Sequence, residues 1–339
     1  MPAALKHALV CLGLALDVIG ASCAPSERAV DDYDTGWRGE LVDGVAHGRW
    51  TWRSPNDGAS ARGTFERGEK TGEWLTTWPD GTLRSVSHWL ADREEGEWIE
   101  RHANGVLSVE GRHAEGRREG TWRAWRADGS PRLELEFRGG LRHGTARGFD
   151  DAGCVQVEGR FVDDLRDGEW RTFHPNGRVR NALTFALGTR TGTESEWFES
   201  GARLLERDWL ADRLDGPARQ WHASGALRSE GRFAAGRKEG AWTSWYADGA
   251  LESRRNYVAD ALDGPCEIFH SNGAPARHST FRAGVLHGAF ESWYPTGVPK
   301  ACGAYVDGLA EGAWAHTRPD GTPDPELSGN YSRGVRVGD

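Results

Sequence analysis

The chain has 339 residues and a formal net charge of −9, with 46 glycines, 17 tryptophans and one methionine. The acidic balance argues against a nucleic-acid partner, because phosphate groups require a basic surface. Glycine is nearly twice as frequent as in ordinary proteins, yet no collagen-like triplet accounts for it, so the glycines indicate many tight turns.

The first 23 residues form a segment of their own. Lys6 and His7 precede the apolar run 8–16, which is too short to span a membrane and is typical of a secretory signal peptide. Residues 19–23 resemble the lipobox of bacterial lipoproteins, which makes Cys23 a lipidation candidate. We therefore expect an exported protein, either periplasmic or held at the membrane through this lipid alone. Cleavage without lipidation and a cytoplasmic location are the alternatives.

Residues 24–35 are polar and acidic and have little apolar surface to bury, so we expect a flexible tether there. The rest of the chain, residues 36–339, repeats with a fixed period of 24 residues. A period of this length predicts a repeat architecture in which each unit packs on its neighbours. The twelve anchor glycines, counted below as position 0, are Gly48, Gly72, Gly96, Gly120, Gly144, Gly168, Gly192, Gly216, Gly240, Gly264, Gly288 and Gly312.

Two turn signals divide each 24-residue repeat into two strands. Asn-Gly or Asp-Gly recurs at positions 8 and 9, as in Asn176-Gly177, and this pair favours positive φ at both residues of a hairpin turn. Position 20 is always glycine or aspartate, as in Gly188 and Asp212, which indicates a second tight turn. We therefore predict an all-β fold: an elongated array of about twelve antiparallel hairpins, as a single twisted sheet or an open solenoid.

Aromatic residues recur at positions 2 and 17, and they predict a ladder that joins successive units. If the second turn is centred on positions 21 and 22, residue 17 of one unit faces residue 2 of the next, as in Phe65 and Trp74. Ala146, Glu194 and Ala218 replace the tryptophan at position 2 and interrupt this ladder.

A third aromatic column stands at position 5. Its parity differs from that of position 2, so it points to the opposite face of the sheet unless a bulge intervenes. An exposed aromatic stripe is typical of a partner surface. The candidates for partner binding are Trp125, Phe149, Phe173, Trp197, Trp221, Trp245, Phe269 and Trp293.

Other reactive residues give weaker patterns. The position-6 histidines His102, His174, His222 and His270 lie too far apart to share a metal, and we expect them to be solvated. In seven repeats the residue at position −1 is acidic. We interpret it as a residue that stabilises the turn, with cation binding as the alternative. We predict no metal site, no cofactor and no catalytic residues, hence no enzyme. Pro323 and Pro325 are expected to blunt the final strand edge.

The pattern Gly-x-Trp-x-x-aromatic-x-x-Asn-Gly, followed by an aromatic and a Gly-rich turn, resembles MORN repeats, and most closely the bacterial variant subgroup labelled YwqK-type antitoxins. The resemblance covers Gly39 to about Gly338. It implies a sheet of hairpins that acts in protein contact, scaffolding or membrane association.

The leading hypothesis is therefore a non-catalytic scaffold that binds a protein partner or envelope surface along its aromatic face. The alternatives are a module that binds carbohydrate or a cell-envelope polymer, and an antitoxin-like protein that neutralises a partner toxin. A homodimer formed through one sheet face stays open.

Overall fold

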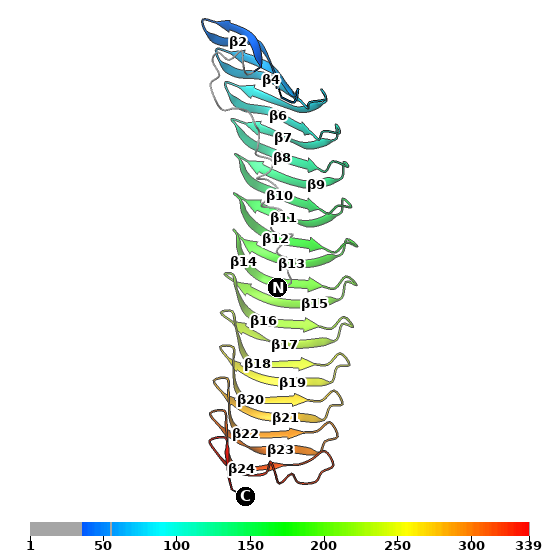
Figure 1. Cartoon of the computed structure of the whole chain (residues 1–339), viewed down its shortest axis with the longest axis vertical. Coiled ribbons are helices and arrows are strands. Elements are labelled where there is room, and N and C mark those ends of the chain that lie inside the picture. The colour runs from blue at the N-terminus through cyan, green and yellow to red at the C-terminus, as the bar shows by residue number, and fades with distance from the viewer. Residues whose placement is uncertain (1–35, 55, 339) are drawn as a thin grey trace. The chain divides into compact units, whose positions relative to one another are not determined.

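The structure, a computed structural model, describes residues 36–54 and 56–338. The predicted signal segment 1–23, the lipidation candidate Cys23 and the tether 24–35 lie outside the described residues. The chain divides into two units, residues 1–177 and 178–339, and each is described by itself. Figure 1 labels the strands of both. The described parts of both consist of strands and turns without a helix.

In the first unit each strand pairs antiparallel with the next strand along the chain. The strands are β1 (Trp37–Val42), β2 (Val45–Arg53), β3 (Ser60–Glu66), β4 (Glu69–Thr77), β5 (Leu83–Leu90), β6 (Arg93–Arg101), β7 (Leu107–Ala114), β8 (Arg117–Trp125), β9 (Pro131–Arg138), β10 (Leu141–Phe149), β11 (Val155–Val162) and β12 (Leu165–Phe173).

The second unit repeats this antiparallel meander. Its strands are β13 (Val179–Ala186), β14 (Thr189–Trp197), β15 (Arg203–Leu210), β16 (Arg213–Trp221), β17 (Leu227–Ala234), β18 (Arg237–Trp245), β19 (Leu251–Val258), β20 (Ala261–Phe269), β21 (Pro275–Arg282), β22 (Val285–Trp293), β23 (Pro299–Val306), β24 (Leu309–His316), β25 (Gly329–Ser332) and β26 (Val335–Gly338). The predicted all-β array of antiparallel hairpins is confirmed.

The second turn of each repeat is a two-residue turn at positions 19 and 20. Ala91 and Asp92 show the pattern, with φ of 52° and 62° between the paired residues Leu90 and Arg93. Positive φ at both residues matches the twist of the flanking strands and explains why position 20 is always glycine or aspartate. Position 19 has no such restriction in sequence, so a left-handed alanine, leucine or arginine there is held by its surroundings.

The first turn differs from the prediction. At Asp80-Gly81 only the glycine has positive φ, and its amide donates to the carbonyl of Trp78. The Asp80 carboxylate accepts hydrogen bonds from the amide and hydroxyl of Thr82. This geometry fits a type I turn followed by a left-handed glycine, a longer hairpin loop in which aspartate or asparagine fixes the backbone and does not take positive φ itself.

The predicted register is also corrected. Because the turn occupies positions 19 and 20, Phe65 stands opposite Lys70 and not opposite Trp74. A bulge follows at the anchor glycine, where Gly72 has φ of 64° and the register shifts against the preceding strand. The rings of Phe65 and Trp74 nevertheless meet edge to face, with centroids 5.0 Å apart, as diagonal neighbours.

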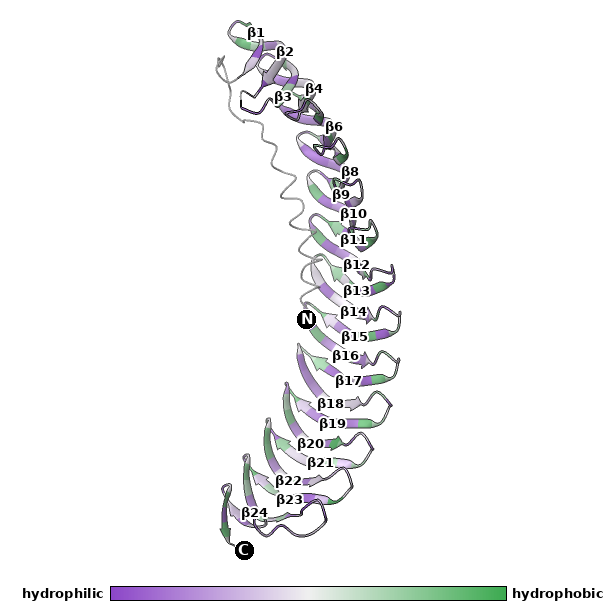
Figure 2. Ribbon diagram, turned by 45° about the vertical axis from the view of Figure 1, so that its right-hand side comes forward, coloured by the Kyte–Doolittle hydropathy of each residue, from purple (hydrophilic) through white to green (hydrophobic). Residues whose placement is uncertain are grey.

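In each of the two units, buried side chains gather on one face of the sheet, called here the inner face. It carries positions 2, 4, 13, 15 and 17, including Trp122, Ala124, Leu133, Leu135 and Phe137. A sheet one layer thick can bury these side chains only on the hollow side of bent strands, and Figure 1 shows that the strands bend along their length. Hydrophobic and hydrophilic residues alternate along the strands in Figure 2, as a sheet with two different faces requires.

The prediction that Pro323 and Pro325 blunt the final strand edge is wrong. Pro323 makes an isolated bridge with Thr317 in the loop after β24, and Pro325 lies in the same loop. The chain then adds β25 and β26, so β26 is the final strand and its residues contain no proline. The two prolines therefore shape a loop within the repeat and do not blunt the edge.

Candidate binding surfaces

The inner face is held together by ring contacts between positions 2 and 17. In the first unit, Phe161 and Trp170 lie 5.0 Å apart edge to face, and in the second, Phe233 and Trp242 lie 5.1 Å apart. The indole nitrogens of Trp170 and Trp242 donate to the carbonyls of Arg160 and Arg232. These tryptophans are thus engaged on ring and nitrogen, which favours a structural role for both columns.

Cations at position −2 lie over these rings. The Lys70 ammonium is 4.8 Å from the Trp74 ring centroid and 4.5 Å from that of Trp89. The Arg190 guanidinium is 3.8 Å from Trp209 and also pairs with Asp212 at 2.9 Å. Cation–π contacts of this kind stabilise the inner face and give it positive charge, although the chain as a whole is acidic.

Glu194, one of the residues that interrupt the tryptophan column, builds a polar cluster instead. Its carboxylate is 2% exposed and accepts hydrogen bonds from Asn181 (3.0 Å), Arg207 (2.6 Å) and the Trp209 indole (2.7 Å). Burial, followed by repulsion from Glu194, raises the pKa of the neighbouring Glu196. Because the Glu194 carboxylate is fully engaged, this cluster pairs strands and does not offer a free acid or base.

His113 is the exception in column 17 and takes the place of a phenylalanine. Its ring lies 4.9 Å from that of Trp122, and its Nε2 is 3.1 Å from the Glu94 carboxylate. Burial, followed by repulsion from Arg118, lowers the pKa of His113 to about 4, while burial raises the pKa of Glu94. At neutral pH the contact is therefore a hydrogen bond from a neutral imidazole, not an ion pair.

A register shift stands between positions 4 and 5, so contacts and not parity place the position-5 column on the side opposite the inner face, called here the outer face. The His278 ring lies 4.8 Å from Trp293 and 6.3 Å from Phe269, and His278 pairs with Glu291 of the same face. Both faces of the sheet thus carry aromatic residues. All eight candidates are half-buried.

Beside this column, the outer face of the first unit carries an alternating ladder of charges. Arg123 contacts Glu110 at 3.3 Å and Glu134 at 2.9 Å, and Arg147 bridges Glu134 at 3.4 Å and Glu158 at 3.9 Å. Within this ladder Arg123, Glu134 and Arg147 each have an opposite charge on both sides. Exposed pairs of this kind add little stability singly, but they fix an ordered charge pattern on the surface.

The sequence predicted that the position-6 histidines are solvated turn residues, and the structure corrects this prediction. The Nε2 atoms of His102, His222 and His270 lie 2.9–3.0 Å from the carbonyls of Trp125, Trp245 and Trp293, each in the next repeat. A carbonyl only accepts, so these nitrogens donate. The side chains of Tyr246 and Tyr294 make the same link. Position 6 therefore fixes the backbone beneath the position-5 aromatics.

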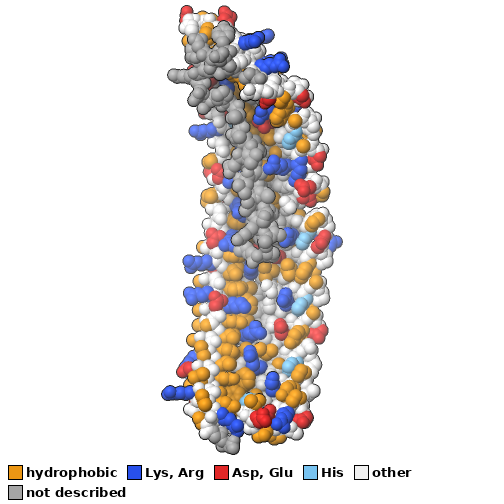
Figure 3. Space-filling model, in the orientation of Figure 1, with side chains coloured by type: hydrophobic (Ala, Val, Ile, Leu, Met, Phe, Trp, Pro, Cys, Tyr) orange, Lys and Arg blue, Asp and Glu red, His pale blue; other side chains and the backbone are white. Residues whose placement is uncertain are grey.

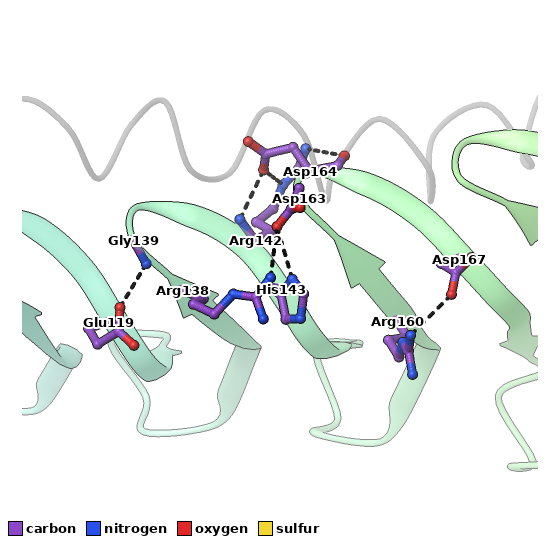
Figure 4. A network of polar contacts seen from close by, with 9 residues as sticks. All are labelled: Glu119, Arg138, Gly139, Arg142, His143, Arg160, Asp163, Asp164 and Asp167. Atoms are coloured by element: carbon purple, nitrogen blue, oxygen red, sulfur yellow. Dashed lines mark hydrogen bonds and ion pairs between the residues drawn. The ribbon is translucent and has the colours of Figure 1, made fainter.

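The acidic column at position −1 lies along the rim formed by the second turns. Glu119 accepts a hydrogen bond from the Gly139 amide at 2.7 Å (Figure 4), and Glu239 accepts one from the Ala259 amide at 3.0 Å. Each acid caps the left-handed residue at position 19, which assigns the column to turn chemistry. At His143 histidine replaces the acid, and the turn residue is an aspartate, Asp163, whose carboxylate lies 3.0 Å away.

The same rim exposes aliphatic side chains that the sequence analysis did not single out. In the first unit Leu90, Leu141 and Leu165 are 45–58% exposed. In the second unit they are Leu187, Leu210, Val258, Val285, Val306 and Leu309. Their positions, 18, 19 and 21, flank the two-residue turn, and this recurrence was the available signal.

Residues 36–54 and 56–338 hold neither a cluster of metal ligands nor a helix that could cross a membrane. No group of three or more His, Cys, Asp or Glu side chains there could hold a metal ion. No helix in this part of the chain has the length and apolar character to cross a membrane. Cys154, Cys266 and Cys302 are free thiols, of which only Cys266 is buried.

Comparison with known families matches two of the repeats. Residues 166–186 and 238–259 fit the family described as the MORN repeat variant. The chain carries MORN-type repeats. The matched segments cover the first turn of the repeat with its flanking strands, β12 to β13 and β18 to β19. Among curated proteins no sequence match is found.

Solved structures give only distant likenesses. Crystal structures of TcdB2-TccC3 and of TcdB2-TccC3-Cdc42 share 10% identity with the MORN-type chain, cover 80% of it and give a TM-score of 0.17. The chain spans 18% of the length of those proteins. At such a TM-score the likeness carries no argument about fold or function.

Proposed function

We propose that this chain is a non-catalytic repeat scaffold that binds a protein partner on its outer face, along the position-5 aromatics. The observation that carries the proposal is their recurrence in eight consecutive repeats, from Trp125 to Trp293, as half-buried rings. The inner-face tryptophans are engaged within the sheet itself, whereas these rings keep part of their surface for a partner.

The surroundings of the column support protein binding. Half-buried aromatic side chains on a fixed backbone are typical of the residues that dominate protein interfaces, because they bury large area and lose little entropy. The links from His222 to the Trp245 carbonyl and from His270 to the Trp293 carbonyl hold that backbone. The Arg–Glu ladder beside the rings would select a partner by charge pattern.

The test is retention of proteins from extracts of the source cells. The variant Trp197→Ala/Trp221→Ala/Trp245→Ala should lose the retained partner, while circular dichroism shows the sheet intact. The matched control Leu210→Ala/Val258→Ala/Val285→Ala removes exposed aliphatics from the rim and should retain it. Equal retention by all three proteins would contradict a binding role for position 5.

We propose further that the scaffold is exported and held through Cys23. The support is the signal-like sequence 1–23. Mass spectrometry of the N-terminus after expression in bacteria should find an acylated Cys23. Neutralising a partner toxin would be another form of protein binding, and it requires the chain to stay in the cytoplasm. Recovery of the protein with its first 23 residues in the cytoplasmic fraction would favour that form.

A further inference from the structure

A hollow of about 230 Å³ opens on the inner face of the second unit. It lies over β15 to β19 at the repeat where Ala218 replaces the position-2 tryptophan, and Trp242 of the next repeat forms one wall. Hydrophobic side chains form a stripe on the face of the second unit seen in Figure 3, with Lys and Arg side chains among them.

The hollow exists because the large side chain of Arg207 points away from the small Ala218 opposite it. Arg207 stands opposite Ala218 in the pairing of β15 with β16. Its guanidinium is directed to Glu194, 2.6 Å away, and lies near the Trp209 ring, so it does not fill the space over Ala218. Where Ala146 replaces the tryptophan in the first unit, the opposite residue is Leu135, and both are 1% exposed.

The hollow is lined by basic side chains and by no acidic one. Arg255 occupies position 15, as Arg207 does two repeats earlier, but Trp242 stands where Glu194 stands for Arg207. Arg255 and Lys238 are half-buried and line the hollow. Within the described part of the chain, neither side chain has a carboxylate at ion-pair distance, and none of the residues lining the hollow is acidic. A half-buried cation without a counter-charge favours an anionic ligand.

The remaining walls suit a ring. Phe233, Trp242 and Tyr257 supply aromatic surface, with the Lys238 ammonium 4.5 Å from the Trp242 centroid and 5.0 Å from that of Tyr257. Ser244 and Ser253, whose hydroxyls lie 2.7 Å apart, supply polar contacts. The volume is below that of pockets for drug-sized molecules, so one ring fits better than an oligomer.

We propose that this hollow binds a carboxylate carried on a six-membered ring, such as an acidic sugar or an aromatic carboxylate. The carboxylate pairs with Arg255 and Lys238 and supplies to Arg255 the partner that Glu194 supplies to Arg207. The ring lies against Phe233, Trp242 and Tyr257. This site is on the inner face and is separate from the position-5 surface, so either proposal can fail without the other.

The experiment is calorimetric titration of the full chain at pH 7 and low salt with glucuronate, benzoate, glucose and acetate. We expect glucuronate, benzoate or both to bind with a dissociation constant on the order of 1 mM or tighter, and glucose and acetate to bind at least about tenfold more weakly. Glucuronate alone would identify an acidic sugar, and benzoate alone an aromatic carboxylate.

Two variants separate the site from the general surface. Arg255→Gln should weaken binding about tenfold or more, because it removes a charge-assisted contact. Arg254→Gln is the matched control, since Arg254 is the adjacent arginine, is exposed and pairs with Glu267. It should bind as the parent does. No binding of either ring carboxylate, or equal binding by folded Arg255→Gln, would overturn the proposal.

Discussion

The indole of Trp122 lies flat against the backbone of Gly111, so that a Cβ at Gly111 would be 2.2 Å from the Cδ2 atom of the ring. Gly159 and Trp170 repeat this contact in the first unit, and Gly231 and Trp242 repeat it in the second. Where the tryptophan is Ala146, the opposite residue is Leu135. A tryptophan at position 2 therefore requires a small residue at position 15 of the preceding repeat.

This relationship predicts the effect of adding one methyl group. Gly111→Ala should lower the free energy of unfolding by about 1–3 kcal/mol, because the indole must leave its place. Urea denaturation measures the change. In a Trp122→Leu background the same substitution should be nearly neutral. An equal loss in both backgrounds would mean that the indole is not the obstacle.

His113 predicts a sensitivity to acid. Its pKa in the folded chain, about 4, lies below the ordinary 6.5. Between these two pH values the imidazole is therefore protonated in the unfolded chain and neutral in the folded chain. Stability should therefore fall as pH drops from 6.5 toward 4, by roughly 3 kcal/mol at most. His113→Phe should remove this part of the pH dependence, as measured by urea midpoints at several pH values. A parallel pH profile for the two proteins would contradict the assignment.

Glu239 tests whether the acidic column caps turns. Glu239→Ala removes the acceptor for the Ala259 amide, which is held at φ of 51°, and should destabilise the fold by about 0.5–1.5 kcal/mol. Glu239→Gln keeps a carbonyl acceptor and should be close to the parent. Millimolar calcium should leave the melting temperatures of all three proteins unchanged. A calcium shift that Glu239→Gln abolishes would instead indicate a cation site.

Glu194 predicts a large loss from a single truncation. Glu194→Ala leaves Arg207 without its carboxylate, and we expect a loss of about 2–3 kcal/mol, less than for a fully buried pair because the Arg207 side chain is 23% exposed. The double variant Glu194→Ala/Arg207→Ala should lose less than the sum of the single changes. Thermal unfolding of the four proteins gives the coupling, and additive losses would refute it.

The sequence predicts the array of hairpins well because the same pattern of glycines and aromatic residues recurs in nearly every repeat. The two turns near Gly81 and Asp92 follow from residue type alone. The side taken by position 5 does not, because a register shift stands between positions 4 and 5. The register also needed the structure, since the bulge at Gly72 and the two-residue turn at positions 19 and 20 place Phe65 diagonal to Trp74. The glycine inside the strand was the available signal of that bulge. Position 6 was misjudged because the acceptor of His222 is a backbone carbonyl in another repeat. The hollow at Ala218 depends on which way Arg207 turns.

Hydroxyl-radical footprinting of the intact chain, with and without the partner it retains, shows directly whether the position-5 aromatics form the partner surface. A partner bound on the outer face should give new protection at Trp221, Trp245 and Trp293. Trp170 and Trp314, which are 4% and 6% exposed, should be protected in both states. Unchanged labelling of the three outer tryptophans, with protection at the rim aliphatics Leu210 and Val258, would contradict a partner surface at position 5.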